Sequence, residues 1–559
     1  MKKISPTLLL LLILSLAAFL RFWQLGSVPV SPDWDEAALG YNAYSIFKTG
    51  RDEYGTQFPL TLRSFDDYKP PLYMYLAVPF VGFLGLDTWV VRLPSAICGV
   101  LAVWGTYILV GELVVLMQQK EKEKQRRKNS FDVFSVRWLP VLATGLVAIS
   151  PWHIQFSRIA FEANIGLTIN IWAIVAFLKG VKNSKWLYGS AGLFGLGFYA
   201  YHSERVFLPL FVIMVCMLFF KQLVAKRRDV LIAAVIGIIV VAPLLPVLLD
   251  KNTTTRLRFT SSLGDQTKLL WRSAAKTNDD IAGGDKFGIL FHNRRIEWAK
   301  TILSGYLSHY SLLWLFLIGD NDRHHAPGMG LLYLWELPFL LAGMYTMARR
   351  GGKPVKFLFA WFLIAPVAAA PTTEVPHAIR TLVFLPTFQI FVGYGLLAVY
   401  QRLKQRGRAV AGLGLLIVGT VAVFNFAYYV QMYFIHMNHE YSRFWQYGYK
   451  EAVEYVQANR SKYKKIVVST KLEQPHMFFL YFLRYDPAKY LAEGGTASGG
   501  FEDVRNKFDI FEFRDIKWYL PEIKDGSVLY IGRPDEIPDK GLKVIKYLDG
   551  IDAMHIADR

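Results

Sequence analysis

Residues 7–25, TLLLLLILSLAAFLRFWQL, form an apolar run that is long enough to cross a bilayer and that follows Met1-Lys2-Lys3. An acidic stretch, Asp33-Trp34-Asp35-Glu36, comes a few residues later. We therefore expect its carboxylates to emerge at a membrane face. Adjacent carboxylates are unfavourable there unless a cation, a metal or a proton-accepting role compensates their charge. The alternative is an ordinary solvated loop.

The composition is that of a polytopic membrane protein. Of 559 residues, 53% are hydrophobic, and 15 Trp, 30 Tyr and 40 Phe are enough to build aromatic belts. A net charge of +19 would favour a nucleic-acid partner in a soluble protein. Here Lys and Arg crowd into short connectors between apolar runs, so we expect no nucleic-acid partner. Cys98 and Cys216 lie inside apolar runs and indicate no disulfide framework.

About eleven membrane spans are predicted from the apolar runs, which makes the fold class a polytopic α-helical membrane protein. The spans are Thr7–Leu25, Val91–Leu116, Trp138–Pro151, Ile165–Leu178, Trp186–Tyr201, Val206–Phe220, Val230–Leu249, Gly330–Met347, Val355–Ala370, Thr381–Tyr400 and Val410–Met432. Because the first run lacks a small-residue cleavage site, we expect a retained helix rather than a signal peptide. Interfacial or re-entrant helices are predicted at Leu72–Leu84, Leu312–Ile318 and Ala37–Phe47.

The basic connectors orient the chain. Six Lys or Arg fall in Lys120–Lys128, three in Lys179–Lys185, and four in each of Lys221–Arg228, Arg349–Lys356 and Arg402–Arg408. With these spans, every one of the connectors lies on the side of the N-terminus. By the positive-inside rule that side is the cytoplasm. The predicted location is therefore the plasma membrane, with the N-terminus cytoplasmic and the C-terminal region extracytoplasmic.

The opposite face collects polar side chains from several separate connectors. These are Asp35, Glu36, Asp66, Asp67, Lys69, Arg158, Glu162, His202, Glu204, Arg205, Asp320, Asp322, Arg323, His324, His325, Glu374, His377 and Arg380. Any one of them is explained by anchoring at the membrane interface. Together they indicate a cavity of buried charges, and we expect the chemistry to take place at the outer leaflet.

The order and spacing of several motifs resemble those of the GT-C glycosyltransferases, specifically the protein-mannosyltransferase (family 39) and lipid A aminoarabinose transferase type. The resemblance covers roughly residues 5 to 430. Its motifs are Asp35-Glu36 with Tyr41 and Thr49-Gly50, Lys69-Pro70-Pro71-Leu72, Phe83-Leu84-Gly85, Val91-Arg92-Leu93-Pro94-Ser95, Ser150-Pro151-Trp152-His153, Ser157-Arg158-Ile159-Ala160 and Pro376-His377-Ala378-Ile379-Arg380.

The resemblance implies a polyprenyl-phosphate-linked sugar donor and an extracytoplasmic acceptor, which is a lipid, a glycan or a protein. It also implies that Asp35 is the catalytic base and that Glu36 supports it. One position departs from the pattern: the aminoarabinose-transferase type has a Glu directly before the Lys-Pro pair, and this chain has Tyr68. A metal role for Asp66 and Asp67 would therefore be unsupported.

Physical chemistry adds candidate substrate contacts to this picture. An anionic phosphate at the lipid headgroup needs cations, and Lys69, Arg158, Arg205 and Arg380 are the candidates. The other predicted substrate-binding residues are Tyr41, Glu162, His202, Asp320, His324, His325 and His377. The segment from Gly319 to His325 lacks the closed spacing of a structural zinc site and is interpreted as a substrate-contacting loop. The sequence leaves open whether a divalent metal is a cofactor.

The remaining outer segments are assigned by composition. The stretch Asp250–Tyr310 is polar with little periodicity, and a loop of that length is typical of a functional or mobile segment that closes over an acceptor. Residues 433–559 are predicted to form a small extracytoplasmic α/β accessory domain after a transmembrane domain of residues 1–432. Its predicted helices are Tyr449–Arg460 and Pro475–Arg484, and its strands are Lys465–Ser469, Phe508–Phe513, Val528–Ile531 and Leu542–Tyr547.

Two other function classes stay open beside the transferase. A transporter or flippase of lipid-linked saccharide would be expected to carry charges or broken helices at the bilayer midplane, together with paired halves, and the sequence shows neither. A partner-binding membrane protein with an inactive site is disfavoured by the intact Asp35-Glu36 and Lys69.

Overall fold

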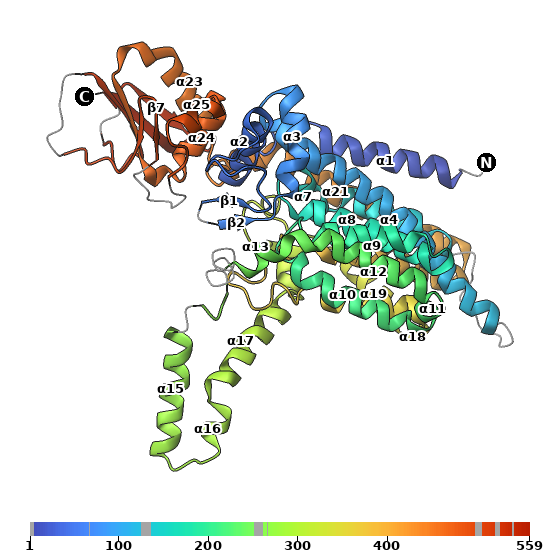
Figure 1. Ribbon diagram of the computed structural model, residues 1–559. Coiled ribbons are helices and arrows are strands. Elements are labelled where there is room, and N and C mark those ends of the chain that lie inside the picture. The colour runs from blue at the N-terminus through green and yellow to red at the C-terminus, as the bar shows by residue number, and fades with distance from the viewer. Residues whose placement is uncertain are drawn as a thin grey trace. The chain divides into compact units, whose positions relative to one another are not determined.

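The computed structural model describes residues 5–65, 67–124, 136–250, 261–264, 267–497, 506–519, 526–538 and 541–558 (Figure 1). Within these ranges the chain divides into two compact units. Unit 1 contains residues 1–17, 101–153 and 166–426, and unit 2 contains residues 18–100, 154–165 and 427–559. The basic connector predicted at Lys120–Lys128 continues beyond the described residues, which stop at 124 there.

Unit 1 is helical. Its residues come from α1 (Pro6–Phe22), α4 (Thr88–Lys124), α6 (Leu139–Ile149), α7 (Pro151–Arg158), α8 (Ala163–Lys182), α9 (Trp186–Gly197), α10 (Glu204–Leu218), α11 (Phe220–Val224), α12 (Arg227–Val241), α13 (Leu245–Leu249), α15 (Thr267–Ala282), α16 (Gly288–Phe291), α17 (Arg294–Ser308), α18 (Glu336–Arg350), α19 (Lys353–Ile364), α20 (Thr387–Arg406) and α21 (Arg408–Gln431). Gly343 and Gly395 let the backbones of α18 and α20 touch, since a Cβ on either would lie 1.9 Å from a carbonyl oxygen of the other helix.

Five described helices are long and apolar enough to cross a membrane, and a sixth span is possible if α6 and α7, which meet at a bend of 56°, are counted as one. Each of the eleven predicted spans overlaps a helix. The helical membrane character is therefore confirmed, whereas the number eleven stays a prediction.

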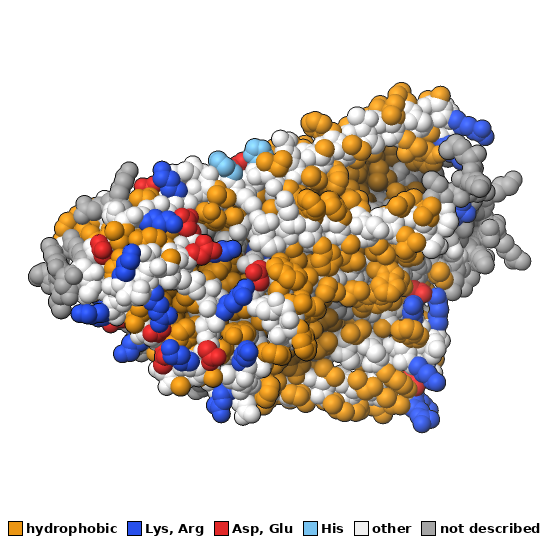
Figure 2. Space-filling view, turned by 90° about the horizontal axis from the view of Figure 1, so that it is seen from above, with side chains coloured by type: hydrophobic (Ala, Val, Ile, Leu, Met, Phe, Trp, Pro, Cys, Tyr) orange, Lys and Arg blue, Asp and Glu red, His pale blue; other side chains and the backbone are white. Residues whose placement is uncertain are grey.

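The surface of these helices suits lipid rather than water. Side chains such as Ile238, Leu416 and Phe424 are about two-thirds exposed, at 67%, 67% and 70%. On the face shown in Figure 2, hydrophobic side chains cover a broad area of the helical part, and Lys and Arg side chains gather at its end. An apolar surface of this extent marks contact with membrane or with another protein.

Unit 2 combines the loop that follows α1 with the C-terminal segment. The loop supplies α2 (Trp34–Thr49), the hairpin β1 (Leu62–Ser64) and β2 (Asp67–Lys69), and α3 (Leu72–Leu84). The C-terminal segment supplies α22 (Met437–Tyr441), α23 (Tyr449–Asn459), α24 (Pro475–Leu483) and α25 (Pro487–Ala492). Helix α2 packs on α3, α24 and α25. Gly40 permits this approach, because a Cβ there would lie 2.7 Å from Val91 and 2.8 Å from Tyr481.

The C-terminal segment also forms a six-stranded sheet of order β4-β5-β3-β6-β8-β7. Its strands are β3 (Lys465–Val468), β4 (Lys507–Phe508), β5 (Phe511–Phe513), β6 (Val528–Gly532), β7 (Lys543–Lys546) and β8 (Asp552–Asp558). Strand β3 is parallel to β5 and β6, whereas the β4–β5, β6–β8 and β7–β8 pairs are antiparallel. The core on one part of the sheet contains Val467, Trp518, Tyr530 and Ile537.

Two expectations need correction, and one strand has no counterpart among them. The stretch Asp250–Tyr310 is not a long structureless loop, because α15, α16 and α17 occupy most of its described residues. The single strand predicted at Phe508–Phe513 is a tight hairpin of β4 and β5, which reverses at Asp509, a residue with φ +52°. Strand β8 was not predicted at all.

Candidate active site

The acidic stretch is the first turn of α2, and its own side chains start that helix. Asp33 is the N-cap: its Oδ1 accepts from the Glu36 amide at 2.8 Å, and Glu36 Oε2 accepts from the Asp33 amide at 3.3 Å. This reciprocal pair is a capping box. Carboxylates in a first turn are further stabilised by the unpaired amides of the helix N-terminus. The capping box therefore fixes the start of α2 and, with it, the positions of Asp35 and Glu36 in the first turn.

Glu36 is locked by a buried cation. Arg92 donates from Nε to Oε1 and from Nη2 to Oε2, both at 2.8 Å, and both side chains are at most 1% exposed. The Ala160 amide donates to Oε1 at 2.7 Å. Arg92 also donates to the carbonyls of Leu25, Pro29 and Ser31 at 2.8–3.0 Å. Because every oxygen of Glu36 is used inside the protein, this carboxylate holds structure in place.

Asp35 differs from Glu36 in being accessible. Its side chain is 32% exposed and forms an ion pair with Lys69, which is only 7% exposed. Burial opposes the charge on Lys69, but Asp35, Glu162 and Asp67 together raise the pKa of Lys69 above its ordinary value. Lys69 therefore stays protonated, and it stabilises Asp35 as a carboxylate. An exposed carboxylate beside a fixed ammonium group can accept a proton from a bound hydroxyl or amine.

Two other predicted residues of unit 2 are engaged with the protein. Arg158 is fully buried and donates to the carbonyls of Leu20, Gln24 and Val28 at 2.7–3.2 Å. The Tyr41 hydroxyl donates to the Tyr485 carbonyl at 3.2 Å. These contacts give both residues a structural role. Glu162 is 7% exposed and acts on the charge of Lys69. Asp66 lies outside the described residues.

Sequence reasoning missed a second buried carboxylate in unit 2. Glu53 accepts from Asn42 Nδ2 at 2.9 Å and from Thr496 Oγ1 at 2.6 Å. Burial raises the pKa of Glu53 to about 7, although these two hydrogen bonds oppose the shift. Sequence reasoning also gave no role to Arg92, although this residue belongs to the motif Val91–Ser95. A charge at the predicted start of a span was the available signal, since such a charge needs a partner.

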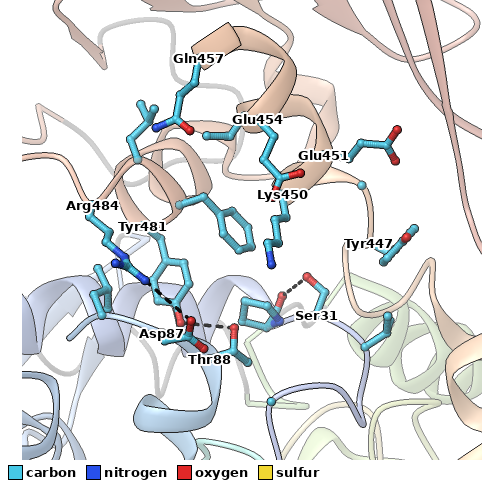
Figure 3. A pocket seen from close by; sticks show the side chains of 18 residues that line it. Ser31, Asp87, Thr88, Tyr447, Lys450, Glu451, Glu454, Gln457, Tyr481 and Arg484 are labelled. Carbon is cyan, nitrogen blue, oxygen red and sulfur yellow. Dashed lines mark hydrogen bonds and ion pairs between the residues drawn. The ribbon is translucent and has the colours of Figure 1, made fainter. Parts of the chain in front are cut away.

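A polar cavity of about 720 Å³ also lies within unit 2. Figure 3 shows its labelled side chains, which include Lys450, Glu451 and Glu454 on α23. On the opposite wall, Arg484 lies 3.7 Å from Asp87. Ser31 and Pro32 line the cavity as well, and the Ser31 carbonyl accepts from Arg92. The wall of the cavity is thus connected through Arg92 to Glu36.

The histidines gather in unit 1. His324 Nδ1 lies 2.9 Å from Asp320 Oδ2, and His377 Nδ1 lies 4.0 Å from the same oxygen. The Ala378 amide donates to that oxygen at 2.8 Å. Burial disfavours the charge on Asp320, but His324 and the hydrogen bond from the Ala378 amide hold the pKa of this carboxyl well below its usual range. Burial, assisted by His324 and Arg380, lowers the pKa of His377 well below its ordinary value, so this imidazole is neutral.

The other predicted residues of unit 1 have local partners. Arg380 donates to Thr372 Oγ1 at 2.7 Å and to the Thr373 carbonyl at 2.6 Å. His325 Nδ1 lies 2.9 Å from the Ala326 carbonyl. His202 precedes α10, and Arg205 in its first turn donates to the Phe198 carbonyl at 3.3 Å. Of the predicted set, the structure therefore brings together Asp35 with Lys69 in one unit, and Asp320 with His324 and His377 in the other.

No protein-family model and no curated protein matches the sequence. Among solved structures, the crystal structure of ArnT from Cupriavidus metallidurans bound to undecaprenyl phosphate superimposes with a TM-score of 0.55 at 13% identity, over 99% of this chain and 98% of that one. The same protein in the apo state gives a TM-score of 0.54 at 13% identity, over 98% and 97%. ArnT is the lipid A aminoarabinose transferase, a GT-C enzyme.

The chain has the GT-C fold. The fold predicted from the sequence motifs is thus confirmed over nearly the whole length of the chain. At 13% identity the likeness concerns the GT-C fold alone.

Proposed function

We propose that this chain is a membrane glycosyltransferase that moves a sugar from a polyprenyl-phosphate donor to an extracytoplasmic acceptor, with Asp35 as the catalytic base. The observation that carries the proposal is the contrast between the two neighbouring carboxylates. Glu36 is saturated by Arg92 and Ala160, whereas Asp35 is 32% exposed and paired with Lys69. The GT-C fold supports it, since a protein with this fold was crystallised with undecaprenyl phosphate.

The proposed reaction is a displacement at the anomeric carbon. Asp35 accepts the proton of an acceptor hydroxyl or amine while that atom bonds to the anomeric carbon. The bond from the anomeric carbon to the phosphate oxygen breaks, and polyprenyl phosphate leaves with the electron pair. Lys69 stabilises the carboxylate before transfer and faces the negative charge of the phosphate. A one-step displacement inverts the anomeric centre.

The acceptor is proposed to occupy the polar cavity of unit 2. Sugars are bound by planar polar groups and aromatic rings, and the cavity offers Glu454, Gln457, Lys450 and Tyr481. We further propose that the protein lies in the plasma membrane with its N-terminus in the cytoplasm and its C-terminal domain outside.

The decisive experiment compares membranes of cells with and without this chain by mass spectrometry of glycolipids and glycoproteins. Loss of the chain should leave a polyprenyl-phosphate sugar to accumulate and should remove one glycosylated product. Restoring the Asp35→Asn variant should not restore the product, whereas restoring the variant Asp535→Asn, at a position that is 66% exposed and does not line the cavity, should. An unchanged set of glycoconjugates would contradict the proposal. A translocator would instead change the side of the membrane on which the donor is found, and would tolerate Asp35→Asn.

A further inference from the structure

The loop from Gly319 to His325 is folded back on itself. Gly319 has φ +65°, a left-handed conformation that favours glycine, and a Cβ there would lie 2.2 Å from the ring of His325. His325 therefore packs directly on Gly319, which closes the loop. This closure brings Asp320 and His324 together, with Oδ2 and Nδ1 at 2.9 Å.

A second loop adds a third side chain. The Ala378 amide donates to Asp320 Oδ2, and the neighbouring His377 points its Nδ1 to within 4.0 Å of that oxygen. One ligand atom from each of Asp320, His324 and His377 lies within 4.8 Å of the other two. Among the described residues this is the single group of three such side chains found so close together.

Two atoms of this group are buried without a hydrogen bond. Asp320 Oδ1 and His377 Nδ1 have no hydrogen-bond partner within the described part of the chain. Their side chains are 11% and 12% exposed. Buried polar atoms are nearly always satisfied, so two such atoms in one close group of ligand-type side chains favour a site that binds a ligand.

We propose that Asp320, His324 and His377 bind one divalent transition-metal ion, with Zn²⁺ favoured. Two imidazoles and one carboxylate form a set that suits zinc, whereas Mg²⁺ and Ca²⁺ prefer oxygen ligands. Ligand atoms placed about 2.0–2.1 Å from a tetrahedral zinc lie roughly 3.4 Å from one another. The separations of 2.9 Å and 4.0 Å lie on either side of that value, and no two of the three ligand atoms are more than 4.8 Å apart, so modest side-chain adjustments would bring the three atoms to the zinc distance.

The surroundings match those of a metal site with an open position. The His377 amide donates to His309 Nε2 at 3.2 Å, and His309 Nδ1 lies 2.7 Å from the Gly305 carbonyl, so a second layer of hydrogen bonds fixes the loop. Asp320 and His377 line a cavity of about 480 Å³ together with Asn321 and Glu374. Three protein ligands leave the fourth zinc position for water or for a ligand that enters from this cavity.

The test measures metal directly in the full-length protein, in detergent, after removal of metal with a chelator and addition of Zn²⁺ alone. We expect one zinc per chain by elemental mass spectrometry, and a rise in thermal midpoint with zinc concentration. With Co²⁺, we expect the visible absorption of a tetrahedral ion. His324→Ala, His377→Ala and Asp320→Asn should each weaken binding by more than the ~10–100-fold that loss of a second-layer partner causes.

His292→Ala is the matched control. His292 Nδ1 lies 2.6 Å from Asp280 Oδ2 in the same unit, so it forms a His–Asp pair of similar length, but the pair belongs to no group of three ligands in the described residues. This variant should bind zinc as the unaltered chain does. The proposal is overturned if the unaltered chain takes up no zinc at micromolar concentrations, or if all four variants bind alike. Neither result depends on the sugar donor, so the proposed transfer reaction stands or falls separately.

Discussion

Asp35 and Glu36 are neighbours with opposite environments, and this difference is the basis of the roles proposed for them. Asp35→Asn keeps the volume and removes the proton acceptor, so we expect turnover to fall by about 10²–10⁴-fold. Binding of undecaprenyl phosphate, measured by thermal shift, should survive in this variant because Lys69 is retained. If the Asp35→Asn variant transferred sugar at the normal rate, Asp35 would not be the catalytic base.

Glu36→Gln should act differently, because Glu36 accepts from Arg92, Ala160 and Asp33 and faces no solvent. We expect a lower thermal midpoint, and a turnover that recovers on cooling. A variant that is as stable as the unaltered chain but inactive would exchange the roles of the two carboxylates.

Glu53 predicts a pH dependence of stability. Burial raises the pKa of Glu53 to about 7 from an ordinary value of 4.5, so the folded state holds a proton that the unfolded state has released between these values. Stability is therefore greatest below about pH 4.5 for this group and falls as the pH rises to about 7, by roughly 3 kcal/mol at most. Glu53→Gln should make the thermal midpoint less dependent on pH over this range, whereas Glu454→Gln, at an exposed position, should leave that dependence unchanged. Parallel profiles for Glu53→Gln and the unaltered chain would contradict the shift.

At the level of elements, Arg92 joins α4 to the first turn of α2 and to the segment of residues 25–31. Arg92→Met leaves the Glu36 carboxylate buried without its cation, which should lower the free energy of unfolding by about 3–5 kcal/mol. The double variant Arg92→Met/Glu36→Leu should regain part of that loss. Lys182→Met breaks the more exposed pair with Glu112 and should change stability by about 1 kcal/mol or less. An equal loss of unfolding free energy in Arg92→Met and Lys182→Met would show that the buried Arg92–Glu36 pair stabilises the fold no more than an exposed pair does.

Elements are predicted well where their composition sets them apart from the flanking sequence. The helix at Leu72–Leu84 and the strand at Lys465–Val468 were predicted to within a residue, because one is continuously apolar and the other is bounded by Lys and Ser. Strand β8 is not evident from the sequence because Asp552, Ala553 and Ala557 are residue types that are uncommon in strands, and its pairing with β6 and β7 overrides that preference. The polar composition of α15 and α17 favours a loop, so the sequence does not reveal these two helices.

The candidate site was predicted as a collection of residues but not as a set of contacts. The Asp33–Glu36 capping box is local, so sequence spacing could reveal it. Arg92 with Glu36 and His377 with Asp320 join residues 56 and 57 positions apart along the chain, and no spacing rule reaches that far. Arg158 was expected to bind phosphate because arginines often do, whereas its guanidinium donates to three backbone carbonyls.

At the level of the whole molecule, the orientation in the membrane is the prediction on which the location of every site depends. In a chain carrying Cys98→Ala and Cys216→Ala, a cysteine at Ser461 should react with a membrane-impermeant maleimide in intact cells. Ser461 is exposed in unit 2 and belongs to the predicted outer domain. A cysteine at the exposed Asn183, inside the basic connector Lys179–Lys185, should react only after the membrane is permeabilised. Labelling of Asn183 in intact cells, with Ser461 protected, would reverse the topology and place Asp35 on the cytoplasmic side.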